Sequence, residues 1–503
     1  MNLMRTPLSL AALTTSLFVA SPALATPALP FTVNCKTMNA ANIGVTADAN
    51  GYTSIYPFTH GPDFDWQTYY GSGSMDTPLP ANGIICLRSF KGQPSAYYSY
   101  LRFVRNAGNT PVYFIVETTI DMGYSWLQAS GTTASDFFSA GLTDKGGLGG
   151  PGGSDGGSCD YSVATSKRSG EGLGPGGGYA ANTSYKGGGG GAGPTRSGGA
   201  GYNQSGGASA GALGGTALSA FDHRILHGGS GGGCGDMAGT AYGGGGGGGV
   251  LVVVAGTSIQ TGYNSNAGFA AMGGASNSGG GGGGGGMVRL ISPKIFGDGF
   301  VDVRGSATAL GFGAYTSNPS CNNTSNYGGC GGHGLVKLEG YDVAGNFVQY
   351  THRANGRDSV KFGAPQTPVL AAANIPRVEV TKVTATFDGS TEEQIPPAVD
   401  FTDHPYVHPG MYFRSEQVVT VTVLTKHVPN SSVVKVRMNA MNPANATSVV
   451  VNAGSPVAGA NGSYEYTWTA TLTVPTDAKI GSIEAWVASV CTPGTLGCNT
   501  AYP

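Results

Sequence analysis

Runs of consecutive glycine constrain this chain more than any other feature. The chain has 503 residues, of which 88 are glycine, and its middle contains runs such as residues 187–191, 243–249 and 279–286. A glycine run has no side chain to bury, and ordering each backbone residue costs about 1–2 kcal/mol. Such runs are therefore either flexible linkers or segments whose N–H and C=O groups bond to other segments. Collagen is excluded, because glycine does not occupy every third position.

Two of the runs lead into the same kind of strand. Run 243–249 precedes the apolar residues 250–254, and run 279–286 precedes residues 287–291, which are apolar except for Arg289. A flexible linker is not expected to precede the same kind of strand each time it occurs. Strands that recur at a fixed spacing are typical of stacked repeats.

The spacing of the two copies supports this interpretation. Leu251 and Met287 are 36 positions apart, as are Ile259 and Ile295. Residues 335–338 resemble a third copy after an insertion, and residues 112–116 resemble an earlier copy that lacks the glycine run. Both complete copies continue alike, as residues 268–273 and 299–305.

The sequence thus predicts an all-β fold with a Gly-rich repeat core. We expect a layered or solenoidal β structure, with residues 250–254 covered on both faces because they are apolar throughout. The runs are expected to form left-handed extended helices of the polyproline-II type, which have no internal hydrogen bonds. Without Cβ atoms, several such helices can lie side by side and bond to one another.

The composition divides the chain into four parts. We expect a signal peptide at residues 1–25, a β-rich region at 26–140, the Gly-rich core at 141–364 and a further β domain at 365–503. In the last part, Trp468 and its apolar neighbours at every second position alternate with Glu and Thr. Six or seven such short strands predict an immunoglobulin-like β-sandwich, without the disulfide pattern of antibody domains.

The N-terminus predicts export. Arg5 precedes an apolar stretch at residues 8–19, and Ala23-Leu24-Ala25 matches the small-x-small cleavage pattern. Charged residues are only 11% of the chain and its formal net charge is −2. The signal predicts a secreted or extracellular surface protein without a transmembrane segment, and the low charge argues against a nucleic-acid partner. We expect no cofactor and no metal. The sequence leaves the oligomeric state open.

The eight cysteines are an even number, which suits disulfides in an oxidising compartment. Cys321 with Cys330 and Cys491 with Cys498 are close pairs. The remaining four, in sequence order, are Cys35, Cys86, Cys159 and Cys234, and the sequence leaves their connectivity open.

The glycine-rich part also resembles known proteins. The Gly-Gly-Pro-Gly-Gly stretch at residues 149–153, the His-Gly-Gly-Ser-Gly-Gly-Gly stretch at 227–233 and the glycine-then-strand units resemble Gly-rich exported bacterial surface proteins. They are similar in kind to the polyglycine-sandwich tips of some phage tail adhesins and to the Gly-rich domain of certain receptor ectodomains. The resemblance covers about two fifths of the chain. It implies a structural or adhesive role and a polyglycine-II layer, and it transfers no catalytic residue.

One polar cluster is a candidate ligand site. Asp63 and Asp65 flank Phe64 and precede Trp66, so that Trp66 could stack on a sugar ring while the carboxylates accept hydroxyl hydrogens or hold a cation. In the competing interpretation, the two aspartates cap turns and Trp66 anchors the loop to the core. Aromatic residues elsewhere, such as Tyr69, Tyr70 and Tyr315, are further candidates for glycan contact.

The main enzymatic alternative is polysaccharide cleavage, by a lyase or hydrolase, on a parallel β-helix. Asp155, Asp298 and Asp302 are its candidate carboxylates, although the glycines around Asp298 favour a turn there. We therefore expect a structural or adhesive protein without catalytic activity, with a surface glycan or cell-envelope component as its partner. A subunit of an extracellular filament or matrix is the third alternative.

Overall fold

The computed structural model describes most of the chain between residues 27 and 489. The described residues are 27–55, 62–66, 73–94, 99–106, 109–134, 146–158, 171–181, 187–201, 212–217, 226, 228–237, 240–264, 267–276, 279–306, 328–345, 360–368, 377–387, 390–394, 411–412, 418–426, 430, 432–441, 449–459, 465–473 and 480–489. Within them, the helices are the short α1 (Cys35–Met38) and η1 (Ala40–Asn42), and all other regular structure is strand. The all-β prediction is confirmed. The expected signal peptide lies outside the described residues.

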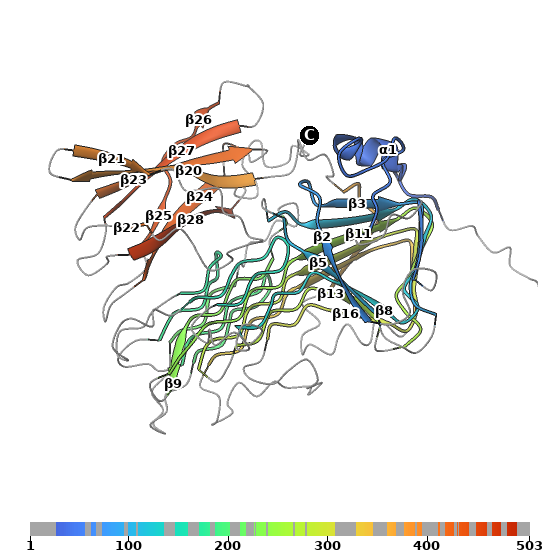
Figure 1. Ribbon diagram of the computed structural model, residues 1–503, viewed down its shortest axis with the longest axis horizontal. Coiled ribbons are helices and arrows are strands. Elements are labelled where there is room, and N and C mark those ends of the chain that lie inside the picture. The colour runs from blue at the N-terminus through green and yellow to red at the C-terminus, as the bar shows by residue number, and fades with distance from the viewer. Residues whose placement is uncertain are drawn as a thin grey trace, which may run out of the picture.

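The strands that precede residue 364 form three parallel sheets and one hairpin (Figure 1). Sheet I contains, in spatial order, β19 (Val360–Gly363), β17 (Leu335–Glu339), β14 (Met287–Ile291), β11 (Val250–Ala255), β6 (Val112–Val116) and β3 (Ile84–Leu87). Sheet II contains β1 (Asp63–Asp65), β4 (Ser89–Lys91), β7 (Thr119–Asp121), β12 (Ser258–Gln260), β15 (Lys294–Phe296) and β18 (Asp342–Val343). Sheet III contains β16 (Phe300–Asp302), β13 (Gly268–Ala270), β8 (Ser125–Gln128), β5 (Ser99–Val104) and β2 (Gly73–Pro78). The hairpin joins β9 (Gly235–Met237) and β10 (Thr240–Tyr242).

From β3 to β18 the chain visits these sheets in a fixed order. Each passage runs through sheet I, sheet II and sheet III before the chain returns to sheet I beside its previous strand. Alternate side chains point inward, and those of all three sheets form one core, to which Phe114, Ile259 and Phe269 contribute. The core therefore lies between the three sheets.

Strand register confirms the repeat and corrects its alignment. Residues 112–116 and 335–338 lie in sheet I beside the two complete copies, as expected. Ile259 pairs with Ile295 as predicted, but Leu251 pairs with Val288 and not with Met287. The alignment was wrong by one residue at this strand, because β11 is one residue longer than β14. A one-residue shift changes the face: Leu251 and Val288 are in the core, whereas Met287 lies on the outer face of sheet I.

The N-terminal part covers that outer face. Phe31 and Val33 pack with Tyr113 and Val252, which point away from the core, and strands β3, β6, β11 and β14 are buried on both sides. Residues 250–254 are fully buried, as predicted from their composition. A disulfide joins Cys35 to Cys86 of β3, and this is the pairing that sequence order gives. It fastens the N-terminal segment to the first strand of sheet I.

Cys234 and Cys330 each take part in a further disulfide. Cys159, Cys321, Cys491 and Cys498 lie outside the described residues, so their pairing stays a prediction.

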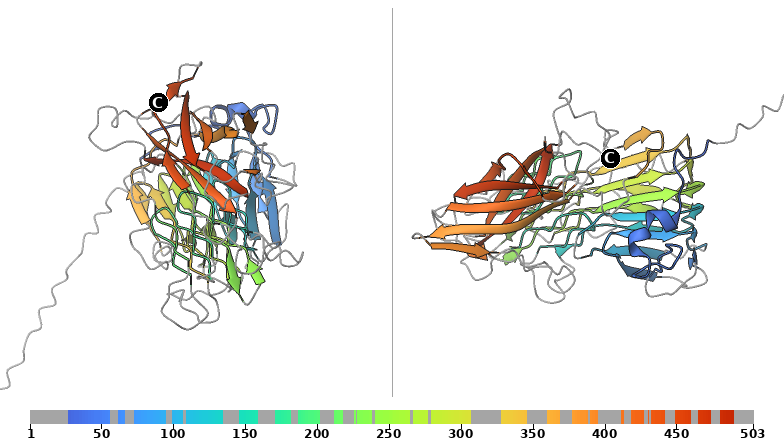
Figure 2. Two further views of the ribbon diagram at one scale, coloured as in Figure 1. Left: turned by 90° about the vertical axis from the view of Figure 1, so that its left-hand side faces the viewer. Right: turned by 90° about the horizontal axis from the view of Figure 1, so that it is seen from above.

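Where the chain passes from sheet III back to sheet I, it forms extended segments that, apart from Gly235 of β9, are neither helix nor strand. We call them the glycine segments; Figures 1 and 2 show them as a bundle of wavy lines in teal to yellow beside the sheets. They are residues 129–134, 146–150, 152–157, 171–181, 187–193, 196–201, 212–217, 228–235, 243–249, 271–276, 279–286, 303–306 and 328–334. The segments at 249, 286 and 334 end directly at β11, β14 and β17.

Beyond residue 376 the described strands form two antiparallel sheets. One contains β21 (Ser390–Gln394), β20 (Arg377–Phe387), β23 (Val418–Lys426), β27 (Glu465–Thr473) and β26 (Val457–Ala458). The other contains β22 (Met411–Tyr412), β28 (Ile480–Ser489), β24 (Val433–Met441) and β25 (Val449–Asn452). Side chains of both sheets share one core, in which Trp468 is buried and donates from Nε1 to Thr425 Oγ1 at 2.8 Å. The alternation predicted along β27 is confirmed.

Candidate functional site

The glycine segments bond to one another with a period of three residues. Along residues 243–249, successive N–H groups donate to three different segments and then repeat the cycle. Gly244 and Gly247 donate to segment 152–157, Gly245 and Gly248 to segment 279–286, and Gly246 and Gly249 to segment 129–134. The donor–acceptor distances are 2.7–3.2 Å. Three residues per turn without internal hydrogen bonds is the geometry of a polyproline-II-type helix.

Carbonyl groups of the same segment accept from three further segments, 146–150, 228–235 and 271–276. Segment 243–249 therefore has six bonded neighbours. Segment 279–286 repeats the pattern, since its donors reach segments 228–235, 328–334 and 271–276 in strict rotation. This arrangement satisfies the backbone groups of each run through its neighbours, in several directions at once.

Close packing between segments explains the choice of glycine. A Cβ atom built on Gly245, Gly283 or Gly331 would lie less than 3.0 Å from backbone atoms of a neighbouring segment. The same holds for nearly every described glycine of these segments. A side chain would push the segments apart and break their hydrogen bonds, so the body they form is built from backbone alone.

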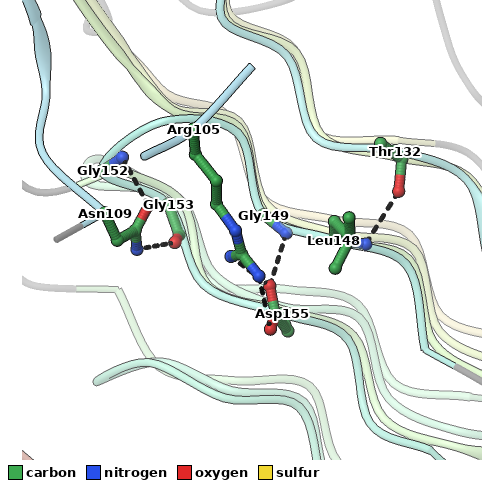
Figure 3. Close-up of polar contacts among 8 residues, drawn as sticks. All are labelled: Arg105, Asn109, Thr132, Leu148, Gly149, Gly152, Gly153 and Asp155. Atoms are coloured by element: carbon green, nitrogen blue, oxygen red, sulfur yellow. Dashed lines mark hydrogen bonds and ion pairs between the residues drawn. The ribbon is translucent and has the colours of Figure 1, made fainter. Parts of the chain in front are cut away.

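Polar side chains fix the first glycine segments next to the sheets (Figure 3). Arg105 follows β5 and forms a buried ion pair with Asp155, with Nη1 2.5 Å from Oδ1. The same carboxylate accepts from the Gly149 N–H at 2.7 Å. Asn109 accepts from Gly152 N and donates to Gly153 O. These contacts anchor the turn between segments 146–150 and 152–157.

A second buried ionic group lies on the outer face of sheet I. Arg289 Nη2 is 2.8 Å from Glu339 Oε2, and Lys337 Nζ is 2.5 Å from Glu339 Oε1. The Glu339 carboxylate also accepts from the backbone of Gln366. This group ties the segment after β19 to β14 and β17.

His333 lies in the glycine segment that ends at β17. Burial lowers the pKa of its imidazole, and the neighbouring Arg196 guanidinium lowers it further. The described surroundings therefore favour the neutral ring. Nearby, Arg304 forms an ion pair of 2.5 Å with Asp302.

The predicted glycan site at Asp63, Asp65 and Trp66 needs correction. The Trp66 side chain is 0% exposed and packs in the core near Phe64, so its ring face is not accessible to a sugar. Asp63 forms an ion pair with Arg88, and Asp65 forms one with Lys91 at 3.2 Å. Arg88 holds the pKa of the Asp63 carboxyl below its usual range. The competing interpretation of Trp66 as a core anchor is the one that this geometry supports.

The carboxylates of the enzymatic alternative occupy different surroundings. Asp155 is buried against Arg105, Asp302 is 7% exposed and paired with Arg304, and Asp298 lies in an exposed turn between β15 and β16. Among the described residues, no group of three His, Cys, Asp or Glu side chains is placed to hold a metal ion. The described helices include none that is long and apolar enough to cross a membrane.

A polar site that the sequence did not indicate lies on sheet II. Tyr263 Oη donates to Asp121 Oδ2 at 2.8 Å, and the Tyr263 ring meets the Tyr124 ring edge-on with centroids 5.6 Å apart. Tyr263 is 41% exposed. The two tyrosines each follow a strand of sheet II by three residues, and only the pairing of β7 with β12 brings them together.

Comparison with known proteins gave no match to any family model, curated protein or solved structure.

Proposed function

We propose that this chain is an exported, non-enzymatic surface protein with a structural and adhesive role. In this proposal the three parallel sheets are a β-solenoid, the glycine segments are a polyglycine-II lattice that stands on it, and the last two sheets are an immunoglobulin-like module. Its partner is a surface glycan or another cell-envelope component.

The threefold hydrogen bonding of the glycine segments is the observation that carries the proposal. Residues 243–249 and 279–286 bond outward to neighbours at every step, so the bundle is cross-linked in several directions. Such a body has few side chains for chemistry and few charges for unspecific ionic binding. Its composition suits a rigid support that holds connecting loops in place.

Two further observations support the architecture. The regular order of strands through sheets I, II and III, with parallel pairing throughout, is that of a solenoid with one strand per sheet in each turn. The antiparallel pair of sheets around Trp468, with one shared core, has the layering of a β-sandwich.

A binding experiment on the purified protein tests the function. Labelled protein is incubated with cell-envelope fragments and with insoluble extracellular matrix, and the retained fraction is measured beside that of the variant Gly245→Val. The proposal expects retention of the wild type, loss of retention in the variant whose lattice is disrupted, and retention in the control Gly363→Ala, where a Cβ meets no atom within 4 Å.

The alternatives give different results in the same samples. Release of soluble oligosaccharide would favour the polysaccharide-cleaving enzyme, and ordered filaments in negative-stain images would favour the assembly subunit. Absence of retention in every fraction would overturn the adhesive role.

A further inference from the structure

The outer face of sheet II carries mostly polar side chains that are half-buried or exposed. Its inward residues, such as Phe90, Ile120 and Ile259, belong to the core, so the residues on either side of each in the same strand point outward. Register aligns one outward row across four neighbouring strands: Lys91, Asp121, Gln260 and Phe296. Neighbouring strands lie about 4.8 Å apart, so this row offers a hydrogen-bonding or apolar group at each such step.

Most charges on this face are already paired. Lys91 binds Asp65 at 3.2 Å, and Lys294 lies 3.8 Å from Asp342. Among the described contacts, Asp121 differs, since its carboxylate accepts from the Tyr263 hydroxyl and from the Gly123 N–H. Each carboxylate oxygen has a further lone pair that can accept a hydrogen bond from a ligand.

Tyr263 and Tyr124 follow the strands that contribute Gln260 and Asp121 to this row. Tyr263 is held by its backbone N–H, which donates to Gly123 O at 2.9 Å, and by its hydroxyl on Asp121. Burial and this hydrogen bond raise the pKa of Tyr263 to about 12, which keeps the hydroxyl protonated as a donor to the carboxylate. The ring is thus fixed in orientation while 41% of the residue stays exposed.

We propose that Tyr263, Tyr124 and Asp121 form a binding site for a neutral pyranose glycan on the outer face of sheet II. The apolar C–H face of the sugar packs on the Tyr263 ring, and its hydroxyls donate to Asp121 in charge-assisted hydrogen bonds. Gln260 offers both a donor and an acceptor to the next sugar along the row. An acidic glycan is disfavoured, because it would meet the Asp121 carboxylate while the nearby Lys91 is occupied by Asp65.

This site names the partner class of the proposed adhesive function and rests on it. The test is affinity electrophoresis of the full-length protein in native gels that contain dextran, mannan, galactan or xylan, with alginate as the acidic comparison. We expect at least one neutral polysaccharide to retard the wild type and the acidic one to leave it unretarded. Tyr263→Ala should raise the Kd at least tenfold, because the stacking surface for the sugar is lost.

Milder variants separate binding from folding. Tyr263→Phe keeps the ring and loses one hydrogen bond, so we expect a Kd about two- to tenfold higher. Asp121→Asn keeps the shape and loses the charge, and it should weaken binding further. The control is Tyr179→Ala, which removes a tyrosine of similar exposure, 47%, from a glycine segment and should leave the Kd unchanged.

The contrary outcomes distinguish failure of this site from failure of the proposed adhesive function. Equal retardation of Tyr263→Ala and the wild type would overturn this site and leave the adhesive function standing. Retardation by alginate alone, or by no polysaccharide while envelope fragments still retain the protein, would likewise overturn the site only. If neither polysaccharides nor envelope fragments retain the protein, both the site and the proposed function fall. A thermal midpoint measured for each variant shows whether a loss of binding reflects unfolding.

Discussion

Gly245 lies where segment 243–249 meets two neighbours. A Cβ atom on this residue would stand less than 3.0 Å from backbone atoms of both Gly274 and Gly283. Glycine is required here because neighbouring backbone occupies the space that a Cβ atom would need. A positive φ is not the reason. Gly123, with φ 53°, shows the other reason for glycine, because its left-handed backbone permits the turn between β7 and β8.

Gly245→Ala should therefore lower the free energy of unfolding by about 3 kcal/mol, since the contacted atoms are backbone and cannot rotate away. Gly363→Ala is the matched control, because a Cβ there has no atom within 4 Å. Its stability should equal or slightly exceed that of the wild type. Guanidinium unfolding of the two variants measures the difference, and equal midpoints would contradict the close packing of the lattice.

The buried pair of Arg105 and Asp155 gives a second prediction for single residues. Asp155→Ala leaves a guanidinium buried without its carboxylate and should cost about 3–5 kcal/mol. The exposed pair of Arg102 and Asp76, each side chain 49% exposed, is the control, and Asp76→Ala should cost less than about 1 kcal/mol. Chemical unfolding distinguishes the two; similar losses would mean that Asp155 does not anchor the glycine segments.

At the scale of elements, the sequence predicted strands well and their register less well. Apolar runs such as residues 250–254 and the alternation around Trp468 identified strands because burial imposes those patterns. The pairing of Leu251 with Val288 was missed by one residue, since the one extra residue of β11 is itself apolar and leaves no mark on hydrophobic spacing. The site on sheet II was not predictable for a similar reason: Asp121 and Tyr263 are 142 positions apart and meet only through strand pairing.

The disulfide between Cys35 and Cys86 gives a testable prediction about how the N-terminal segment is held. It closes a loop with a sequence separation of 51 and holds the N-terminal segment on sheet I. Replacing both cysteines by alanine should lower the stability by about 2–4 kcal/mol. It should also speed amide exchange in residues 27–55 more than in β11. Unchanged exchange in residues 27–55 would show that apolar packing alone retains this segment.

For the whole molecule, the architecture depends on the glycine segments being as ordered as the sheets. The N–H groups of residues 228–233 and 281–286 donate to backbone carbonyls of other segments, so neither segment can open without breaking bonds to several neighbours. We expect amides in segments 228–235 and 279–286 to exchange at least about a thousandfold more slowly than those of an unstructured peptide. Hydrogen-exchange mass spectrometry measures this, and exchange at the rate of an unstructured chain would identify the segments as linkers.

Because donors along residues 243–249 return to the same neighbour at every third position, the length of a segment is restricted. Adding one or two residues would rotate every later N–H toward a different segment, whereas adding three would restore each to its former acceptor. The neighbours would have to lengthen equally, since each of them bonds to several others. A longer form of this protein would therefore grow by whole layers of about 9 Å, three residues in each segment at a time.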